Sequence, residues 1–388
     1  MVDDTVTITE TGHKTQQMNA YFNVKAAEKK LQFSESKCHT MLIHKSKKSK
    51  SFSKLKVDIW KQSHDDDDNL QEIFDGEHIL KETNEQKYLG CILSNDGTNT
   101  KSIKNKVNKS IGTRNTIKTL IKGLGKYTIE SGIIYFKSLM RGSLLYATEA
   151  MVNLKENDFK IIEKAEQATL RDMLKTKFST PRHLLYLELG IIPARFMIKQ
   201  RKVLYLKHIL DLTENSLLQK FYNAQVKSPS KGDWMSEVKE IMKDLGIEFS
   251  IKEISQISKN KFESIVKEKI VKKSFMYLKA ILKQKQKGRN IEYKCLELQS
   301  YLRPRENFKL KSQRELFAFR SKMNDLKANF CSTKDIEKCS KCTLDLDNVH
   351  LFRCTNEFEN IEHLNYNHIL NGTLIEQEKA LKFLNRKS

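Results

Sequence analysis

The chain has 388 residues, a formal net charge of +22 and 39% hydrophobic residues. With 30% charged residues but only 14 Gly and 4 Pro, its composition favours long helices over a β-sandwich. A positive charge of this size is typical of proteins that contact the phosphate backbone of nucleic acids. A merely lysine-rich protein would have the same composition, so charge alone leaves both interpretations open.

The sequence has no features of secretion or membrane insertion. Asp3 and Asp4 stand where a signal peptide would be positively charged, and no run approaches the roughly 18–20 apolar residues that span a bilayer. Four of the seven cysteines lie between Cys331 and Cys354, which suggests metal binding rather than disulfides. We therefore expect an intracellular protein of the nucleus or cytoplasm, with no membrane partner.

Strand character is confined to the first hundred residues. Residues 14–31 predict a helix, and residues 94–97 (Ser-Asn-Asp-Gly) indicate a turn. The Lys- and Ser-rich residues 45–56 and the acidic residues 64–69 are expected to be loops. Short strands are predicted at residues 2–9, 41–44 and 88–93.

From Lys101 onward, apolar residues recur at helical spacing with basic residues between them, as far as Gly123. Further helices are predicted at residues 127–152, 156–176 and 192–213, followed by shorter helices with Lys-rich faces over residues 216–325 and a last helix at residues 374–384.

Asp3 and Asp4 are adjacent carboxylates in a predicted strand–turn–strand. Such a pair can hold the Mg²⁺ with which nucleotidyl transfer activates a 3′-hydroxyl and stabilises the leaving pyrophosphate. Taken alone, the pair is explained more simply as an exposed acidic N-terminus.

Three segments follow the acidic pair in a specific order. They are Leu31-Gln-Phe33, Lys37-Cys-His-Thr-Met41 and Lys87-Tyr-Leu-Gly90. This order resembles the reverse transcriptase palm of non-LTR (LINE-type) retrotransposons. The resemblance implies that Asp3 and Asp4 are catalytic aspartates that bind Mg²⁺. It also implies that Tyr88, Leu89 and Gly90 form the primer grip.

The resemblance continues through the helical part of the chain. The family-like positions are Ser143-Leu-Leu-Tyr-Ala-Thr-Glu149, Arg171, Pro181 with Tyr186-Leu-Glu-Leu-Gly-Ile-Ile-Pro193, Arg201, and Leu316-Phe-Ala-Phe-Arg320 leading to Asn329-Phe330. They are similar to thumb and connector segments of the family. The chain departs from the family pattern at Met1, at residues 34–36 and at Ala147, which takes the place of a glycine. Most apolar residues here are equally well explained as the core of a helical bundle.

Cys339, Cys342, His350 and Cys354 follow the spacing Cys-x2-Cys-x7-His-x3-Cys. Two ligand pairs on tight turns are typical of a closed, structural Zn²⁺ site. Metal binding would supply much of the folding energy of so small a module. Because all four ligands come from the protein, we expect a nucleic-acid-binding or scaffold module rather than a catalyst. Unrelated reduced cysteines are the alternative.

These patterns predict a mainly α protein with a small α/β palm remnant at the N-terminus and a CCHC zinc knuckle near the C-terminus. The expected divisions are a palm remnant (1–100), a helical thumb-like domain (101–215), a basic helical connector (216–325), the zinc knuckle (326–356) and a C-terminal helical tail (357–388).

The resemblance implies a fragment of an RNA-directed DNA polymerase, with RNA and DNA as partners, Mg²⁺ and Zn²⁺ as cofactors, and no small-molecule substrate other than nucleotides. Only two residues precede the acidic pair, so we expect that the chain does not polymerise by itself. A non-catalytic, zinc-dependent RNA- or DNA-binding protein is one alternative. A structural protein whose basic charge is incidental is another.

Overall fold

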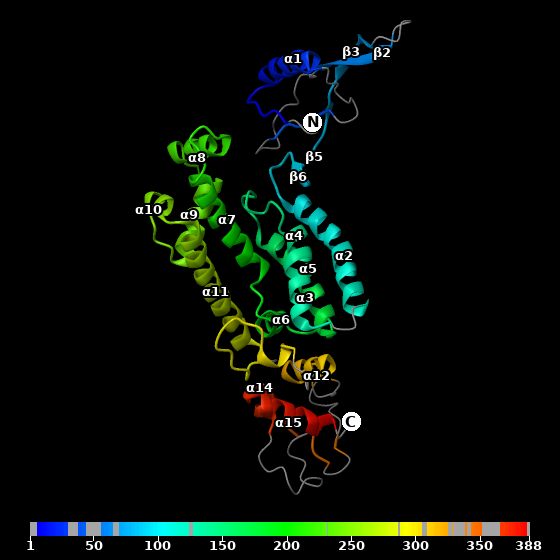
Figure 1. Cartoon of the computed structure of the whole chain (residues 1–388), viewed down its shortest axis with the longest axis vertical. Coiled ribbons are helices and arrows are strands. Elements are labelled where there is room, and N and C mark those ends of the chain that lie inside the picture. The colour runs from blue at the N-terminus through cyan, green and yellow to red at the C-terminus, as the bar shows by residue number, and fades with distance from the viewer. Residues whose placement is uncertain are drawn as a thin grey trace. The chain divides into compact units, whose positions relative to one another are not determined.

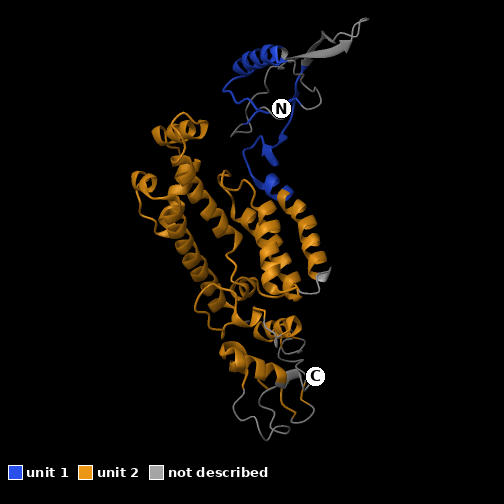
Figure 2. Cartoon of the chain, in the orientation of Figure 1, with its two compact units in different colours: residues 1–105 blue, residues 106–388 orange. Residues whose placement is uncertain are grey.

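The computed structural model describes residues 6–29, 38–43, 56–64, 70–123, 127–230, 232–285, 288–304, 309–324, 329, 338–339, 343–350 and 365–385. Within these residues the chain is mainly helical with small sheets, as the sequence predicts (Figure 1). The chain divides into two compact units, residues 1–105 and residues 106–388 (Figure 2). Among the described residues, no helix is long and apolar enough to cross a membrane.

Within the described residues, the first unit contains helix α1, the first residues of α2 (Thr100–Gly123) and three two-stranded sheets. Helix α1 (Gly12–Glu28) confirms the helix predicted at residues 14–31. Strands β1 (His39–Thr40) and β4 (Lys81–Glu82) pair in parallel. Strands β2 (Lys56–His64) and β3 (Leu70–Ile79) form an antiparallel hairpin. Strands β5 (Glu85–Tyr88) and β6 (Cys91–Ser94) form a second antiparallel hairpin.

Several strand predictions in this unit are wrong. Residues 6–9 and 41–43 are not strands, and β1 lies just before the second of these segments. The β2–β3 hairpin was not expected, because the charged tracts around it indicate loops. Val57, Ile59 and Trp60 nevertheless have high β-propensity and pair with β3, with a register shift between Ile59 and Trp60. Residues 1–5, 44–55 and 65–69 lie outside the described residues.

Helix α2 (Thr100–Gly123) crosses the boundary between the two units. After it, α3 (Ile129–Tyr135), the π-helical turn η2 (Phe136–Met140) and α4 (Arg141–Leu144) follow one another without a break. The helices α5 (Glu156–Leu174), α6 (Arg182–Leu189) and α7 (Ala194–Leu210) complete this part of the second unit. The helices predicted at residues 156–176 and 192–213 are therefore confirmed, with small differences at the ends. The helix predicted at residues 127–152 is confirmed only as far as Leu144, because residues 145–150 form turns in which Ala147 has a positive φ.

The described remainder of the second unit is also mainly helical. Helix α11 has 26 residues, so the prediction of only shorter helices between residues 216 and 325 is wrong there. The remaining elements are α8 (Leu217–Lys227), α9 (Trp234–Leu245), α10 (Ile251–Gln256), α11 (Lys259–Gln284), the 3-10 helix η3 (Ser300–Leu302), α12 (Leu310–Arg320), α14 (Tyr366–Asn371) and α15 (Leu374–Asn385).

An apolar core joins α7, α9 and α11. Val203, Val238 and Val266, one from each helix, are fully buried within it. The apolar residues of α11 recur at every fourth position (Phe262, Val266, Ile270), so one face of this long helix enters the core while its lysines remain outside.

Gly190 fixes the connection between α6 and α7. Its φ of +62° is a left-handed conformation that glycine adopts without strain. A Cβ atom at this position would lie 2.3 Å from the backbone of Glu297 and Leu298. The backbone N–H of Gln299 donates to the Glu188 carbonyl at 3.0 Å, which holds this segment against the end of α6. Gly190 is therefore required both for its conformation and for close packing.

Candidate nucleic-acid interface

Helix α2 has 24 residues and no acidic residue. Ile103 and Ile117 are fully buried on one side of the helix, while Lys104 and Lys109 are exposed. The basic residues of α2 are Lys101, Lys104, Lys106, Lys109, Arg114, Lys118 and Lys122. A helix with this distribution carries a positive field along its length, which favours polyanions such as nucleic acids.

The C-terminal half of α2 lies beside α5 (Figure 1), and Asp172 of α5 connects the two helices. Arg114 donates to both carboxylate oxygens of Asp172, at 3.0 Å from Nη2 to Oδ1, and Lys118 Nζ lies 3.4 Å from the same carboxylate. Two cations therefore share one anion, so a positive charge remains at this point of the surface.

Arg171 adjoins this cluster. Its guanidinium lies over the Phe178 ring, 5.1 Å from the centroid, and its Nη2 donates to the Thr180 carbonyl at 3.1 Å. Its Nε atom is buried and has no hydrogen-bond partner among the described residues. Burial lowers the pKa of Arg171, and the nearby Arg114 adds to this lowering while Tyr186 opposes it. This guanidinium would be stabilised by an anion.

The loop after α5 extends the positive surface. Lys175 ends α5 in a left-handed conformation with φ of +49°, and Arg182 begins α6. Phe178 between them is 87% exposed, although Arg171 lies over its ring, and such exposure is unusual for an aromatic residue. No acidic residue occurs from residue 173 to residue 187. We name Arg114, Lys118, Arg171, Lys175, Lys177, Phe178 and Arg182 the α2–α5 basic patch.

The α2–α5 basic patch combines two kinds of group that bind nucleic acids. Lysine and arginine side chains contact phosphates and position the strand. An exposed aromatic ring stacks on a base without regard to its identity. Arg171 was predicted as a family-like residue only through the resemblance, and Phe178 was not predicted as a binding residue. The sequence feature that could have indicated this patch is the stretch from residue 173 to residue 187, which has no acidic residue and contains a phenylalanine among its basic residues.

Two pairs of family-like residues meet in the structure. Arg201 of α7 donates from Nε to Glu149 at 3.0 Å, and the Glu149 carbonyl accepts from Trp234 Nε1 at 2.7 Å. Glu188 of α6 accepts from Arg320 of α12 at 2.9 Å. These contacts hold the helices together.

Glu166 is a buried carboxylate that the sequence analysis missed. Its side chain is fully buried in α5 and accepts hydrogen bonds from Arg141 Nε at 2.7 Å, Tyr186 Oη at 3.1 Å and the Ala194 backbone N–H at 3.0 Å. Burial raises the pKa of Glu166, while Arg141 opposes that shift. Because every contact holds α4, α6 or α7 against α5, we assign Glu166 a structural role.

The predicted primer-grip residues form the tip of a hairpin. Tyr88 ends β5 and pairs with Cys91 of β6, so Leu89 and Gly90 are the two residues of the turn. Their φ angles are +44° and +80°, the pattern of tight hairpin turns in which both central residues have positive φ. The continuous strand predicted at residues 88–93 is therefore wrong. The turn at residues 94–97 is confirmed, since the Gly97 N–H donates to the Ser94 carbonyl at 3.0 Å.

Leu89 is 59% exposed at this hairpin tip. Asp3 and Asp4, the predicted Mg²⁺ ligands, lie outside the described residues.

Two of the four predicted zinc ligands are described. The Cys339 N–H donates to the Leu344 carbonyl at 2.8 Å, and the Cys339 carbonyl accepts from Thr343 N–H at 2.9 Å. His350 is 7% exposed, and its N–H donates to Asp347 Oδ1 at 2.6 Å. A cysteine thiol and a buried imidazole are donors that suit Zn²⁺.

Cys342 and Cys354, the other two predicted ligands, lie outside the described residues. Within the described part of the chain, no three His, Cys, Asp or Glu residues come together in a group that would hold a metal ion.

Comparisons of the chain with protein-family models, with curated proteins and with solved structures gave no match. The assignment of function therefore depends on the residues, their contacts and their charges.

Proposed function

We propose that the chain is a nucleic-acid-binding part of a reverse transcriptase of the non-LTR retrotransposon type. In this proposal the α2–α5 basic patch contacts RNA or DNA. The observation that carries the proposal is the sharing of the single carboxylate Asp172 by Arg114 and Lys118, beside Arg171, whose guanidinium lies over the exposed ring of Phe178. The basic side chains outnumber the carboxylates here, and an aromatic ring lies beside them. Such a surface is suited to single-stranded nucleic acid, because the cations contact phosphates and the ring stacks on a base.

The positions of the family-like residues support the proposed family. Glu149 with Arg201 and Glu188 with Arg320 form ion pairs between segments that the resemblance identifies separately. Gly190 occupies a position that excludes a side chain. Ala147, where the family has glycine, has a φ of +55°, a conformation that favours glycine. Positions at which the family has characteristic residues are thus structurally demanding in this chain, as expected if the chain descends from the family.

The metal sites remain part of the proposal. Cys339, Cys342, His350 and Cys354 would hold one Zn²⁺, which would fold the C-terminal module and perform no chemistry. Asp3 and Asp4 would bind Mg²⁺ in the polymerase reaction.

Binding to a single-stranded RNA oligonucleotide, titrated against salt concentration, tests the proposed function. We expect log K to fall linearly with log[salt], because each phosphate contact releases a counterion. The double variant Lys175→Gln/Arg182→Gln should bind more weakly and have a slope less negative by about 2. The matched control Lys259→Gln/Lys272→Gln removes the same charge from exposed positions of α11.

Equal losses in the two double variants would show that binding follows net charge and not the α2–α5 basic patch. A slope near zero in the unmodified chain would reject nucleic-acid binding and favour a structural protein with incidental charge. Primer extension on an RNA template with Mg²⁺, compared between the unmodified chain and Asp3→Asn/Asp4→Asn, tests polymerase activity separately. Extension that vanishes in the variant would show that the acidic pair is catalytic.

A further inference from the structure

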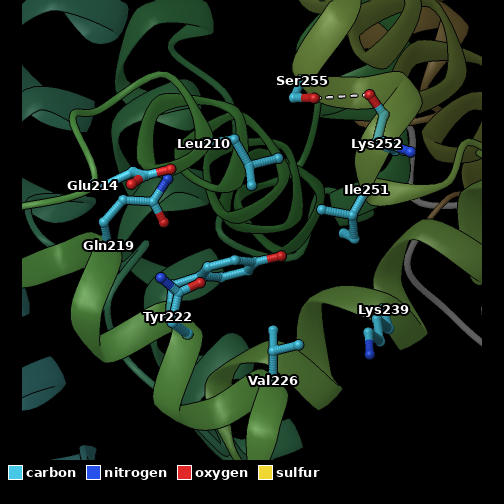
Figure 3. Close-up of a pocket in the computed structure, with 10 residues that line it drawn as sticks. Leu210, Glu214, Gln219, Tyr222, Val226, Lys239, Ile251, Lys252 and Ser255 are labelled. Carbon is cyan, nitrogen blue, oxygen red and sulfur yellow. Dashed lines mark hydrogen bonds between the residues drawn. The ribbon is translucent and has the colours of Figure 1, made fainter.

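A cavity of about 490 Å³ opens between the C-terminal end of α7 and helices α8, α9 and α10 (Figure 3). This volume is within the range of pockets that bind small organic molecules. The cavity belongs to the second unit and includes none of the residues of the α2–α5 basic patch.

The middle of the cavity is apolar. Leu210, Tyr222, Val226 and Ile251 line it from three different helices. The Tyr222 ring extends across the opening between Gln219 and Ile251 (Figure 3). Burial raises the pKa of Tyr222, so its phenol is neutral at physiological pH. A flat aromatic ring between aliphatic side chains is suited to a planar heterocycle such as a nucleobase.

The polar groups of the cavity are segregated by charge. Glu214 and Gln219 lie together on one side, and Lys239 and Lys252 lie on the other (Figure 3). Gln219 Oε1 is buried and has no hydrogen-bond partner among the described residues. The first side therefore offers acceptors to N–H donors, while the second offers cations to a phosphate.

We infer that this cavity binds one nucleotide, with its base edge toward Glu214 and Gln219 and its phosphate toward Lys239 and Lys252. The inference rests on the proposed nucleic-acid function and adds base preference to it. Guanine presents adjacent N1–H and N2–H donors, which match a carboxylate. Uracil has a single N3–H between two carbonyl oxygens. At least one of these oxygens would face the Glu214 carboxylate, and the two acceptors would repel each other. Guanine is therefore the base preferred by this cavity, and uracil is disfavoured.

Calorimetric titration of the full chain with GMP and with UMP tests the base preference. We expect GMP to bind at least about tenfold more tightly, because the Glu214 carboxylate can accept from both guanine N–H groups but would face a carbonyl oxygen of uracil. In Glu214→Gln the preference should fall to about threefold or less, because the carboxylate is lost but the shape is kept. Equal affinities for GMP and UMP in the unmodified chain, or no binding of either at millimolar concentrations, would overturn the inference.

Two further variants test the stacking and phosphate contacts. Tyr222→Leu should weaken GMP binding at least about fivefold, whereas Tyr222→Phe keeps the ring and should bind as the unmodified chain does. Lys252→Gln should weaken the binding of GMP but not of guanosine, which has no phosphate. The control variant is Lys243→Gln, because Lys243 of α9 is exposed and does not line the cavity. Unchanged GMP binding in both Tyr222→Leu and Lys252→Gln would place the nucleotide elsewhere.

Binding of oligouridylate with and without one central guanosine tests whether the cavity holds a nucleotide of a single strand or a free nucleotide. Tighter binding of the guanosine-containing strand, lost in Glu214→Gln, indicates a residue of a single strand. A preference limited to GMP indicates a free nucleotide. Lys175→Gln/Arg182→Gln should weaken both strands while leaving the GMP titration unchanged. The cavity and the α2–α5 basic patch are therefore tested independently.

Discussion

Glu188 of α6 accepts a hydrogen bond from Arg320 of α12 at 2.9 Å, and the two side chains are 1% and 3% exposed. The same carboxylate accepts from Tyr293 Oη at 2.6 Å and from Tyr301 Oη at 2.9 Å. Arg320 also donates to the Ile369 carbonyl at 3.0 Å, at the end of α14. One buried carboxylate thus connects four segments that are distant in the sequence, and its charge is matched by one guanidinium.

Arg320→Met should destabilise the chain by about 3–5 kcal/mol, because it leaves the buried Glu188 charge without a cation. Urea unfolding followed by circular dichroism measures the change. The exposed pair Lys311–Glu315 at 3.8 Å is the control, and Lys311→Met should cost less than about 1 kcal/mol. In the double variant Glu188→Gln/Arg320→Met the loss should be smaller than the sum of the single losses. Additive losses would show that the two residues do not act as a pair.

The sequence could identify Glu188 and Arg320 as family-like residues but could not show that they are partners. Pairing between α6 and α12 depends on the tertiary arrangement of the helices, which a local pattern does not contain. The sequence does not indicate that Tyr293 and Tyr301 donate to Glu188, since a tyrosine in a helical protein is ordinarily a core residue. The basic character of α2 was evident from its acid-free sequence, whereas the exposure of Phe178 could not be predicted because aromatic residues are usually buried.

Gly190→Ala should destabilise the chain by about 2 kcal/mol or more, because the added Cβ meets backbone at 2.3 Å and the φ of +62° disfavours alanine. Gly112→Ala, in the middle of α2, is the matched control. Nothing lies within 4 Å of a Cβ at Gly112, so alanine should stabilise the helix by about 0.5–1 kcal/mol. Thermal unfolding of the two variants should shift in opposite directions. A shift in the same direction would contradict the packing assigned to Gly190.

Ala147→Gly should stabilise the chain by about 0.5–1 kcal/mol. Alanine at a φ of +55° is strained by about 1–2 kcal/mol, and the greater flexibility of unfolded glycine offsets part of the gain. Ala150 is exposed three residues later and is not among the described residues with positive φ. Ala150→Gly should therefore be destabilising or neutral. Destabilisation by Ala147→Gly, measured by urea unfolding, would show that the strain is absent.

Two differences from the sequence predictions have a local physical origin. The π-helical turn at Phe136–Met140 adds a residue to a continuous helix and precedes Arg141, which reaches Glu166. A regular helical periodicity cannot reveal such an insertion. The Leu89–Gly90 turn was hidden within an apolar run, and the positive φ of Leu89 is uncommon for a leucine. In the first place the sequence predicted a helix but not its π-helical turn. In the second it predicted strand structure but not the two-residue turn that divides it.

Asp233 provides a pH-dependent contribution to stability. The backbone N–H groups of Ser230 and Ser236 donate to its carboxylate at 2.8 and 2.6 Å, and they lower the pKa of Asp233 below its ordinary value of 3.8. The stabilisation is present above pH 3.8 and is lost as the pH falls through the lower pKa of the folded state.

Asp233→Asn retains the N-cap of α9 but cannot titrate. The difference in thermal midpoint between the unmodified chain and Asp233→Asn should be constant between about pH 7 and pH 5 and should shrink in acid. A difference that grows as the pH falls below 4 would contradict the sign of the pKa shift.

Removal of zinc should unfold only the C-terminal module if Cys339, Cys342, His350 and Cys354 form the proposed site. We expect one equivalent of zinc in the purified chain by elemental analysis, with affinity at least about tenfold lower in Cys339→Ser. Cys295→Ser is the control, because Cys295 is exposed and is not a proposed ligand. Chelation should increase amide hydrogen exchange at residues 343–350 while leaving α5, α7 and α11 protected, since these helices have their own apolar core. Full zinc occupancy in Cys339→Ser, or none in the unmodified chain, would reject this ligand set.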